Sequence, residues 1–223
     1  MRNLEFANGE FYHVCNRGVD KRNIVDDAYD ANRFVQGLID FNTIKPRGGL
    51  YEISFQKEKG NNHQPLVNII AYCLNPNHFH LLLEQVVDQG ISKFLHRLCG
   101  GHTQYFNLKY DRKGTLFQGP FRAKHVDSDE YLLHVSAYVN LNNRVHQLST
   151  LGAKLVRSSW NEYENQNFFG GICKKDIILD QFGSPEEYKE FTLASLPLMI
   201  ERKEEERGAR EEEDEKLKAL LFE

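Results

Sequence analysis

His78 and His80 stand one residue apart in the apolar run NPNHFHLLLEQ, which spans residues 75–85. In a β-strand, successive side chains point to opposite faces, so the two imidazoles lie on one side and Phe79 on the other. Two imidazoles on one face can share a metal ion. On this pair alone, a half-buried strand with two tolerated polar side chains is the simpler interpretation. A metal site therefore requires a third ligand from elsewhere in the chain.

Tyr138 and Asn142 are a second pair with chemical potential, and they lie within a predicted helix at residues 129–143. A separation of four residues puts both side chains on one helix face, one turn apart. An asparagine oxygen is an acceptable ligand for a hard divalent ion, and tyrosine can act as a nucleophile. Taken singly, Tyr138 also fits an aromatic residue of the core, and Asn142 fits the end of a helix. Neither residue alone therefore indicates a functional site.

The sequence predicts strands and helices that follow one another along the chain and would position these residues. Mixed aromatic and β-branched runs predict strands at residues 9–19, 66–74, 78–86 and 114–126, and residues 50–64 predict a strand that runs into an exposed loop. Apolar residues at a spacing near 3.6 predict helices at 27–44 and 91–110, the second with a possible bend at Gly100-Gly101. Asp127, three residues before Glu130, is the expected cap of the helix that carries Tyr138. This order predicts an α+β domain with helices on one face of a mainly antiparallel sheet.

Length and composition indicate a globular protein with one large domain. The chain has 223 residues, of which 40% are hydrophobic. It has no run of eighteen or more apolar residues, and its first residues lack the apolar core of a signal peptide, so we expect no membrane contact and a cytoplasmic location. Four cysteines without a CxxC pair argue against a zinc ribbon or a redox motif.

Charge is distributed unevenly along the chain. Ten acidic and six basic residues lie between Glu201 and Glu223, so this stretch carries the whole formal charge of -4. The rest of the chain is neutral but contains a basic segment in which Asp111 is the sole acidic residue: Arg97, Lys109, Arg112, Lys113, Arg122 and Lys124. The charged tail predicts a solvated helix, with an oligomerisation arm built on Leu217, Leu220 and Leu221 as the alternative.

Several stretches together resemble one known family. The HFH run is similar to the His-hydrophobe-His motif of the HUH endonuclease superfamily, and AYVNLNN resembles the tyrosine helix of its single-tyrosine transposases. FYHVCNRGVDKRNIV, YFNLKYDRKGTLFQGPFRAK and RSSWNEY resemble further segments of the REP-associated tyrosine transposases, in the family's order. The resemblance spans roughly residues 10–165. Two departures are Asn143, where the family usually has proline, and the GPFR stretch at 119–122, where it has Gly-Arg-Phe-Lys.

The resemblance implies a fold, a reaction and a set of residues. The fold would be that of the HUH endonucleases, with a ferredoxin-like arrangement over residues 1–150, a packed extension at 151–199 and a charged helical tail at 200–223. Tyr138 would attack single-stranded DNA and form a 5′-phosphotyrosine. His78, His80 and Asn142 would hold one divalent ion, Mg²⁺ or Mn²⁺. The basic segment named above would bind the DNA backbone. Bases could stack on Tyr105, Phe106, Tyr110 and Phe117, although Phe106 and Phe117 also fit the core.

The same resemblance implies binding partners, and two other functions remain as alternatives to a transposase. The partner would be single-stranded or hairpin DNA, with a possible homodimer and without a nucleotide cofactor. A replication initiator or relaxase shares the HUH motif but lacks the surrounding matches. A domesticated protein that binds hairpins without cutting them is the alternative from another functional class.

Overall fold

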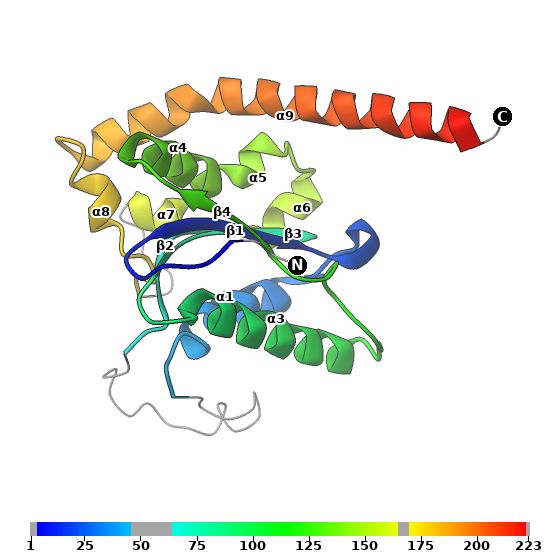
Figure 1. The fold of residues 1–223 in the computed structure, drawn as a ribbon, viewed down its shortest axis with the longest axis horizontal. Coiled ribbons are helices and arrows are strands. Elements are labelled where there is room, and N and C mark those ends of the chain that lie inside the picture. Colours follow the sequence, from blue (N-terminus) through cyan, green and yellow to red (C-terminus); the bar gives the residue numbers. More distant parts are fainter. Residues whose placement is uncertain (1–3, 46–63, 165–169, 222–223) are drawn as a thin grey trace.

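The computed structural model describes residues 4–45, 64–164 and 170–221 of the chain. Its five strands are β1 (Phe11–Arg17), β2 (Val67–Asn75), β3 (His78–Gln85), β4 (Arg122–Val126) and β5 (Arg157–Ser158). They form one sheet in the spatial order β4-β1-β3-β2-β5, and each neighbouring pair is antiparallel (Figure 1). The expected α+β class with an antiparallel sheet is confirmed.

Two long helices cover one face of the sheet. They are α1 (Ala28–Asp40) and α3 (Gly90–Lys109), which follow β1 and β3 in the chain. The short 3-10 helix η1 (Val19–Lys21) lies between β1 and α1. The succession β1, α1, β2, β3, α3, β4 is the split βαβ arrangement of ferredoxin-like folds.

Further helices cover the opposite face, so the expectation of helices on one face alone is wrong. They are α4 (Asp129–Asn140), α5 (Asn142–Val145), α6 (Thr150–Leu155), α7 (Trp160–Tyr163), α8 (Asp176–Leu179) and α9 (Pro185–Leu221). Figure 1 shows α9 running across α4 and α5 and beyond the body of the domain. The physical reason is that β2 and β3 are apolar on both sides and need cover on both.

The structure corrects several predictions about single helices and strands, and one predicted strand lies outside the described residues. The helix α3 continues through Gly100 and Gly101, and a Cβ on Gly101 would meet the Phe41 ring at 2.5 Å, so close packing against the end of α1 requires this glycine. Of the strand predicted at 114–126, β4 contains only the last five residues. The predicted strand at 50–64 falls almost entirely outside the described residues.

The helix carrying Tyr138 begins and ends differently from the prediction. Ser128, not Asp127, caps α4, because the Ser128 side chain accepts a hydrogen bond from the Tyr131 amide. The helix ends at Asn140, and a break at Leu141 separates it from α5. Toward the C-terminus, α9 spans the predicted boundary at residues 199/200, and the side chains of Leu217, Leu220 and Leu221 lie outside the description. Among the described helices, none has the length and hydropathy needed to cross a membrane.

Candidate active site

The strand β3 presents its histidines and its aromatic residue to opposite sides of the sheet. Phe79 is fully buried and packs against the rings of Phe34 and Phe117, at centroid distances of 5.3 and 5.9 Å. The rings of His78 and His80 lie together on the other face, with centroids 5.2 Å apart. The structure thus brings the two predicted histidines to one side, as strand periodicity requires.

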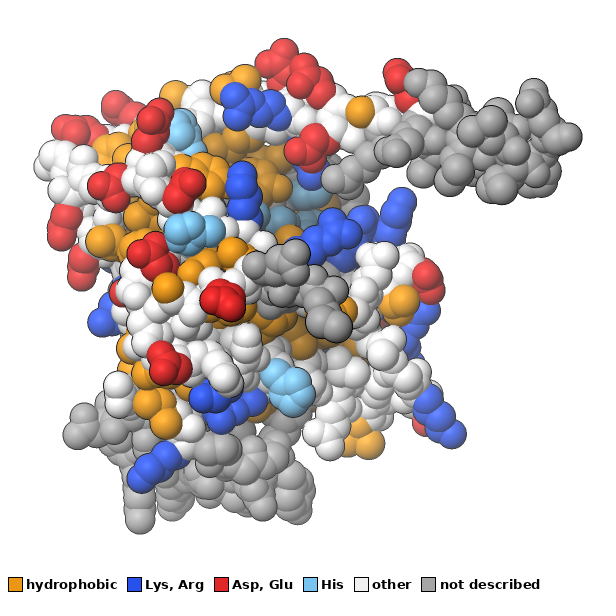
Figure 2. Space-filling view, in the orientation of Figure 1, with side chains coloured by type: hydrophobic (Ala, Val, Ile, Leu, Met, Phe, Trp, Pro, Cys, Tyr) orange, Lys and Arg blue, Asp and Glu red, His pale blue; other side chains and the backbone are white. Residues whose placement is uncertain are grey.

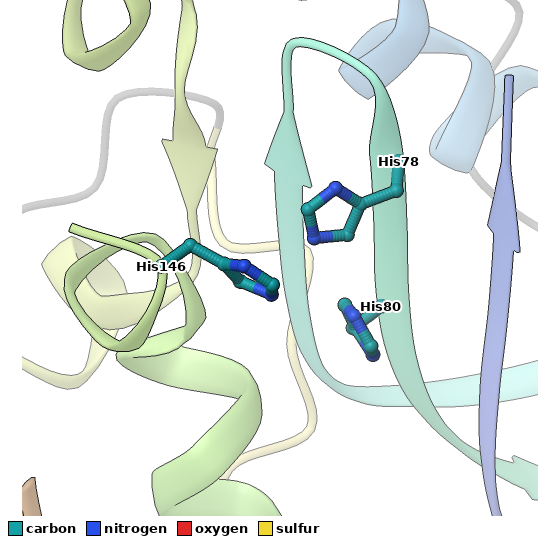
Figure 3. Close-up of side chains that lie close together, drawn as sticks. All are labelled: His78, His80 and His146. Atoms are coloured by element: carbon teal, nitrogen blue, oxygen red, sulfur yellow. The ribbon is translucent and has the colours of Figure 1, made fainter. Parts of the chain in front are cut away.

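A third histidine, His146, completes the cluster. It follows α5 directly, and one ligand atom of each of the three imidazoles lies within 4.8 Å of the others. Figure 3 shows the three rings turned toward a common space between β3 and the end of α5. Sequence analysis missed His146, although it stands four residues after Asn142 and the spacing that linked Tyr138 to Asn142 also reaches it.

Asn142 directs its side-chain oxygen at the histidines. Asn75 Nδ2 donates a hydrogen bond of 2.7 Å to Asn142 Oδ1, and His78 Nε2 lies 3.3 Å from the same oxygen. The Asn142 side chain is fully buried, yet within the described part of the chain its Nδ2 atom has no hydrogen-bond partner. An unpaired buried amide is costly, so its retention here indicates a role other than packing.

Tyr138 lies beside the histidine cluster, on the side of His80. Its ring centroid is 5.6 Å from that of His80 and 5.8 Å from that of His13, both in edge-to-face geometry. Burial raises the pKa of the Tyr138 phenol to about 12, and the neighbouring Asn142 side chain partly opposes this rise. The phenol is therefore protonated at neutral pH, and its ionisation requires positive charge close by.

His13 on β1 orients His80. Its Nε2 atom shares a hydrogen bond of 2.8 Å with His80 Nδ1, which leaves Nε2 of His80 as the nitrogen available to a ligand. His13 lies in the FYHVCNRGVDKRNIV stretch, but sequence analysis did not identify it as a site residue. Only the pairing of β1 with β3 brings it beside His80.

The electrostatics of the cluster suit a cation. Burial lowers the pKa of His78 to about 3 and that of His146 to about 4, and it places the pKa of His80 well below its usual value. All three imidazoles are therefore neutral at physiological pH and offer lone pairs, the state in which histidine binds metals. The three imidazole nitrogens thus form a group that could hold a metal ion, and the Asn142 oxygen lies 3.3 Å from one of them, His78 Nε2.

The C-terminal region fixes the helix that carries Tyr138. The hydroxyl of Tyr188 on α9 lies 2.9 Å from Asn140 Nδ2 and 3.0 Å from Ser136 Oγ. Ser159 Oγ donates to Asn140 Oδ1, and all four residues are buried. Because Ser136 and Asn140 flank Tyr138 in sequence, this network sets the rotation of α4 and the aim of its tyrosine.

The predicted basic residues divide between the two faces of the sheet. Arg122 and Lys124 on β4 pair with Cys15 and His13, so they share the face of the histidines. Figure 2 shows Lys, Arg and His side chains gathered in the hollow between α9 and the sheet.

The other cations predicted to bind DNA lie on or after α3. They are on the face of the sheet that α1 and α3 cover, opposite the histidines, and we call this face the back of the sheet. Arg97 donates to the Thr43 carbonyl, Lys109 contacts two carboxylates, and Arg112 donates to Asn107. Lys113 is exposed in the loop after α3. Of the aromatic residues expected to stack on bases, Phe106 and Phe117 are buried in the core. The structure therefore does not gather the basic segment at one site.

Three comparisons with known proteins bear on this arrangement. Residues 55–142 match the family model described as "Transposase IS200 like", a range that includes His78, His80, Tyr138 and Asn142 but neither His13 nor His146. A solved REP-associated tyrosine transposase bound to a REP hairpin has a similar fold, with a TM-score of 0.52 and 12% identity. The match covers 74% of this chain and 86% of that one. No curated protein matches the chain.

Proposed function

We propose that this chain cleaves and rejoins single-stranded DNA through Tyr138, a proposal supported by the match of residues 55–142 to the IS200-like transposase family model. The observation that carries the proposal is the position of the Tyr138 ring, 5.6 Å from His80 at the edge of a three-histidine cluster. A tyrosine beside a metal-binding set is the arrangement that nucleophilic attack on a phosphodiester requires.

In the proposed reaction, Tyr138 Oη attacks the phosphorus of the scissile phosphodiester. The bond from phosphorus to the 3′ oxygen breaks, and a bond from phosphorus to Tyr138 forms, which leaves a 5′-phosphotyrosine. The phenol gives up its proton to solvent, and the leaving oxygen takes one to become a 3′-hydroxyl. Rejoining is the same exchange in reverse, with a 3′-hydroxyl attacking the phosphotyrosine. The bond energy is conserved, so no nucleotide cofactor is needed.

The ligands we propose are His78, His80 and Asn142, as the sequence predicts, with His146 added. When bound, a divalent ion polarises a phosphate oxygen and stabilises charge in the transition state. Asn75 holds the Asn142 oxygen toward this space through its 2.7 Å hydrogen bond, and His13 holds His80. Three imidazoles favour Mn²⁺ or a later transition metal over Mg²⁺, which prefers oxygen ligands.

The substrate we propose is a DNA hairpin with a single-stranded flank. The solved transposase of similar fold is bound to a REP hairpin, which supports this choice. Arg122 and Lys124 would contact the backbone beside the histidines, and the predicted contacts of Arg97, Lys109, Arg112 and Lys113 stay predictions. We also propose that residues 1–150 form the nuclease domain, and that the C-terminal extension braces α4 through Tyr188.

The decisive experiment is the capture of the covalent intermediate. A hairpin DNA with single-stranded flanks, labelled at its 3′ end, is incubated with the protein and Mn²⁺, then denatured and separated by electrophoresis. We expect labelled protein from the wild type and none from Tyr138→Phe. The matched control is Tyr29→Phe, which removes an exposed phenol from α1, on the other face of the sheet, and should leave the adduct unchanged.

The outcomes separate the proposal from its alternative. An adduct formed by Tyr138→Phe at the wild-type rate would refute Tyr138 as the nucleophile. A wild-type protein that binds the hairpin tightly, but forms no adduct with any divalent ion, would instead be a hairpin-binding protein without cleavage activity.

A further inference from the structure

Arg17, at the end of β1, is the one cation in the described part of the chain that pairs in register with a proposed metal ligand. Its backbone lies opposite that of His78 in the antiparallel pair of β1 and β3. Residues directly opposite each other in such a pair carry their side chains on the same face of the sheet. Arg17 therefore extends toward the histidine cluster, outside the stretch that matches the transposase family model.

The guanidinium of Arg17 has an unmet hydrogen-bonding requirement. Its Nε atom is buried and has no hydrogen-bond partner among the residues that the structure describes. No carboxylate among the residues that the structure describes forms an ion pair with it. A buried guanidinium donor without a partner indicates a missing anion, and the planar fork of arginine matches a phosphate.

The surroundings of Arg17 are positively charged. Its charge acts on His78 and His146, and the charge of Lys203 on α9 acts on the same two histidines. On the neighbouring strand, Arg122 and Lys124 share this face. Glu206 is the carboxylate that also acts on His146. Such a concentration of cations in a hollow attracts a polyanion.

Arg17 and Tyr138 lie at different ends of the histidine cluster. Tyr138 contacts His80 and His13, whereas Arg17 pairs with His78. His78 stands two residues before His80 in β3, about 7 Å from it along the strand. In an in-line displacement, the leaving oxygen departs on the side opposite the nucleophile. A phosphate at Arg17 would consequently belong to the strand that leaves.

We propose that Arg17 binds a phosphate of the leaving strand, on the 5′ side of the cleaved bond, and thereby holds the 3′-hydroxyl in place for rejoining. This inference rests on the function proposed above. It assigns a contact that positions the leaving strand to a residue of β1 and gives the buried Nε atom its partner.

The first test measures equilibrium binding of the hairpin substrate in the Tyr138→Phe background with Mn²⁺, as a function of salt. Arg17→Gln should weaken binding by about tenfold, the loss expected for a charged hydrogen bond. It should also reduce the slope of log affinity against log salt by about one. Lys93→Gln on α3, which removes one exposed charge behind the sheet, is the matched control and should change neither quantity.

The outcomes distinguish this inference from the proposed function. Absence of hairpin binding by the Tyr138→Phe protein itself would refute the function. Normal hairpin binding with equal behaviour of Arg17→Gln and Lys93→Gln would overturn the role of Arg17 alone. A loss of Mn²⁺ affinity in Arg17→Gln, measured without DNA, would show a structural role and would also overturn it. Should Arg17→Gln not fold, Arg17→Lys retains the charge, and unchanged hairpin affinity in that variant would overturn the fork contact.

A second test locates the phosphate. Single phosphates of the substrate are replaced by neutral methylphosphonates, one position at a time, and binding is measured with Arg17 and with Arg17→Gln. At the contacted phosphate, the two changes should not be additive, because each removes the same interaction. Coupling at a position 5′ of the cleaved bond supports the inference. Coupling only on the 3′ side, or at no position, overturns it.

Discussion

The two faces of the central sheet are built from different chemistry although they share the same strands. Behind the sheet, α1 and α3 enclose a core of aromatic and aliphatic residues, and the buried Asp30 is paired with Lys109 beside it. On the other face, the interior under α4, α5 and α9 contains buried polar residues: Asn75, His80, Ser136, Asn140, Asn142 and Ser159. Both faces therefore bury apolar residues, among them Ile70, Leu82 and Val139 on the histidine face, but that face also holds a group of buried polar side chains in fixed positions.

The strand β3 belongs to both faces, and its consecutive residues should respond differently to mutation. Phe79→Ala removes a fully buried ring from the core behind the sheet. We expect the free energy of unfolding to fall by about 3–5 kcal/mol, because transfer energy is lost and a cavity remains. Denaturant unfolding followed by circular dichroism measures this change.

His80→Ala is the matched control for this prediction. The free energy of unfolding should change by about 1 kcal/mol or less, the size of a single hydrogen bond, here the one with His13. Mn²⁺ affinity, measured by titration, should fall by about a hundredfold. If His80→Ala destabilised the protein as much as Phe79→Ala and left Mn²⁺ binding intact, the division between the two faces would be wrong.

On the face covered by α1 and α3, Asp30 is a fully buried carboxylate, and it makes stability depend on pH. Its buried carboxylate accepts hydrogen bonds from Lys109, Tyr105 and Tyr110 at 2.6–2.7 Å and another from the Asp26 amide. Burial alone would raise the pKa of Asp30, but these donors lower it to about 2. The unfolded value is about 3.9, so the folded state favours the ionised form.

The sign of the pH effect follows from this lowered pKa. The stabilisation is fully present above about pH 5 and is lost as pH falls toward 2, since protons then bind the unfolded chain more readily. Asp30→Asn should lower the free energy of unfolding by about 2 kcal/mol at pH 7 and flatten its acid dependence. Asp20→Asn, at an exposed ion pair with Arg22, is the control and should change little. An acid dependence equal to wild type in Asp30→Asn would refute this account.

Much of the histidine face follows from periodicity, which is a local property. Alternation along β3 predicts that His78 and His80 share a side, and helical spacing predicts that Tyr138 and Asn142 do so, despite the break at Leu141. The same spacing reaches His146, so a signal for it exists in the sequence. Likewise, the nearly continuous apolar run of β2 indicates cover on both faces, which argues against helices on one face alone.

Other features depend on strand pairing, which no local pattern reveals. His13 and Arg17 reach the site because β1 lies between β3 and β4, an order that the sequence does not specify. The basic segment from Arg97 to Lys124 is continuous in sequence, but the chain passes from one side of the sheet to the other within it. Proximity of like charges in sequence therefore does not establish a shared surface.

Cations on the two faces of the sheet should differ in their effect on hairpin binding, and this difference is the smallest of the predicted effects. Arg122→Gln removes an exposed cation on the histidine face and should weaken hairpin binding about twofold to fivefold, the size of an exposed ion pair. Lys109→Gln removes a cation that contacts Asp27 and Asp30 behind the sheet, both at 2.6 Å. It should lower stability and leave hairpin affinity unchanged, because its charge is already compensated by those carboxylates. Fluorescence anisotropy with a labelled hairpin, alongside thermal unfolding, separates the two effects. Equal losses of affinity would mean that the DNA wraps around the edge of the sheet and contacts both faces.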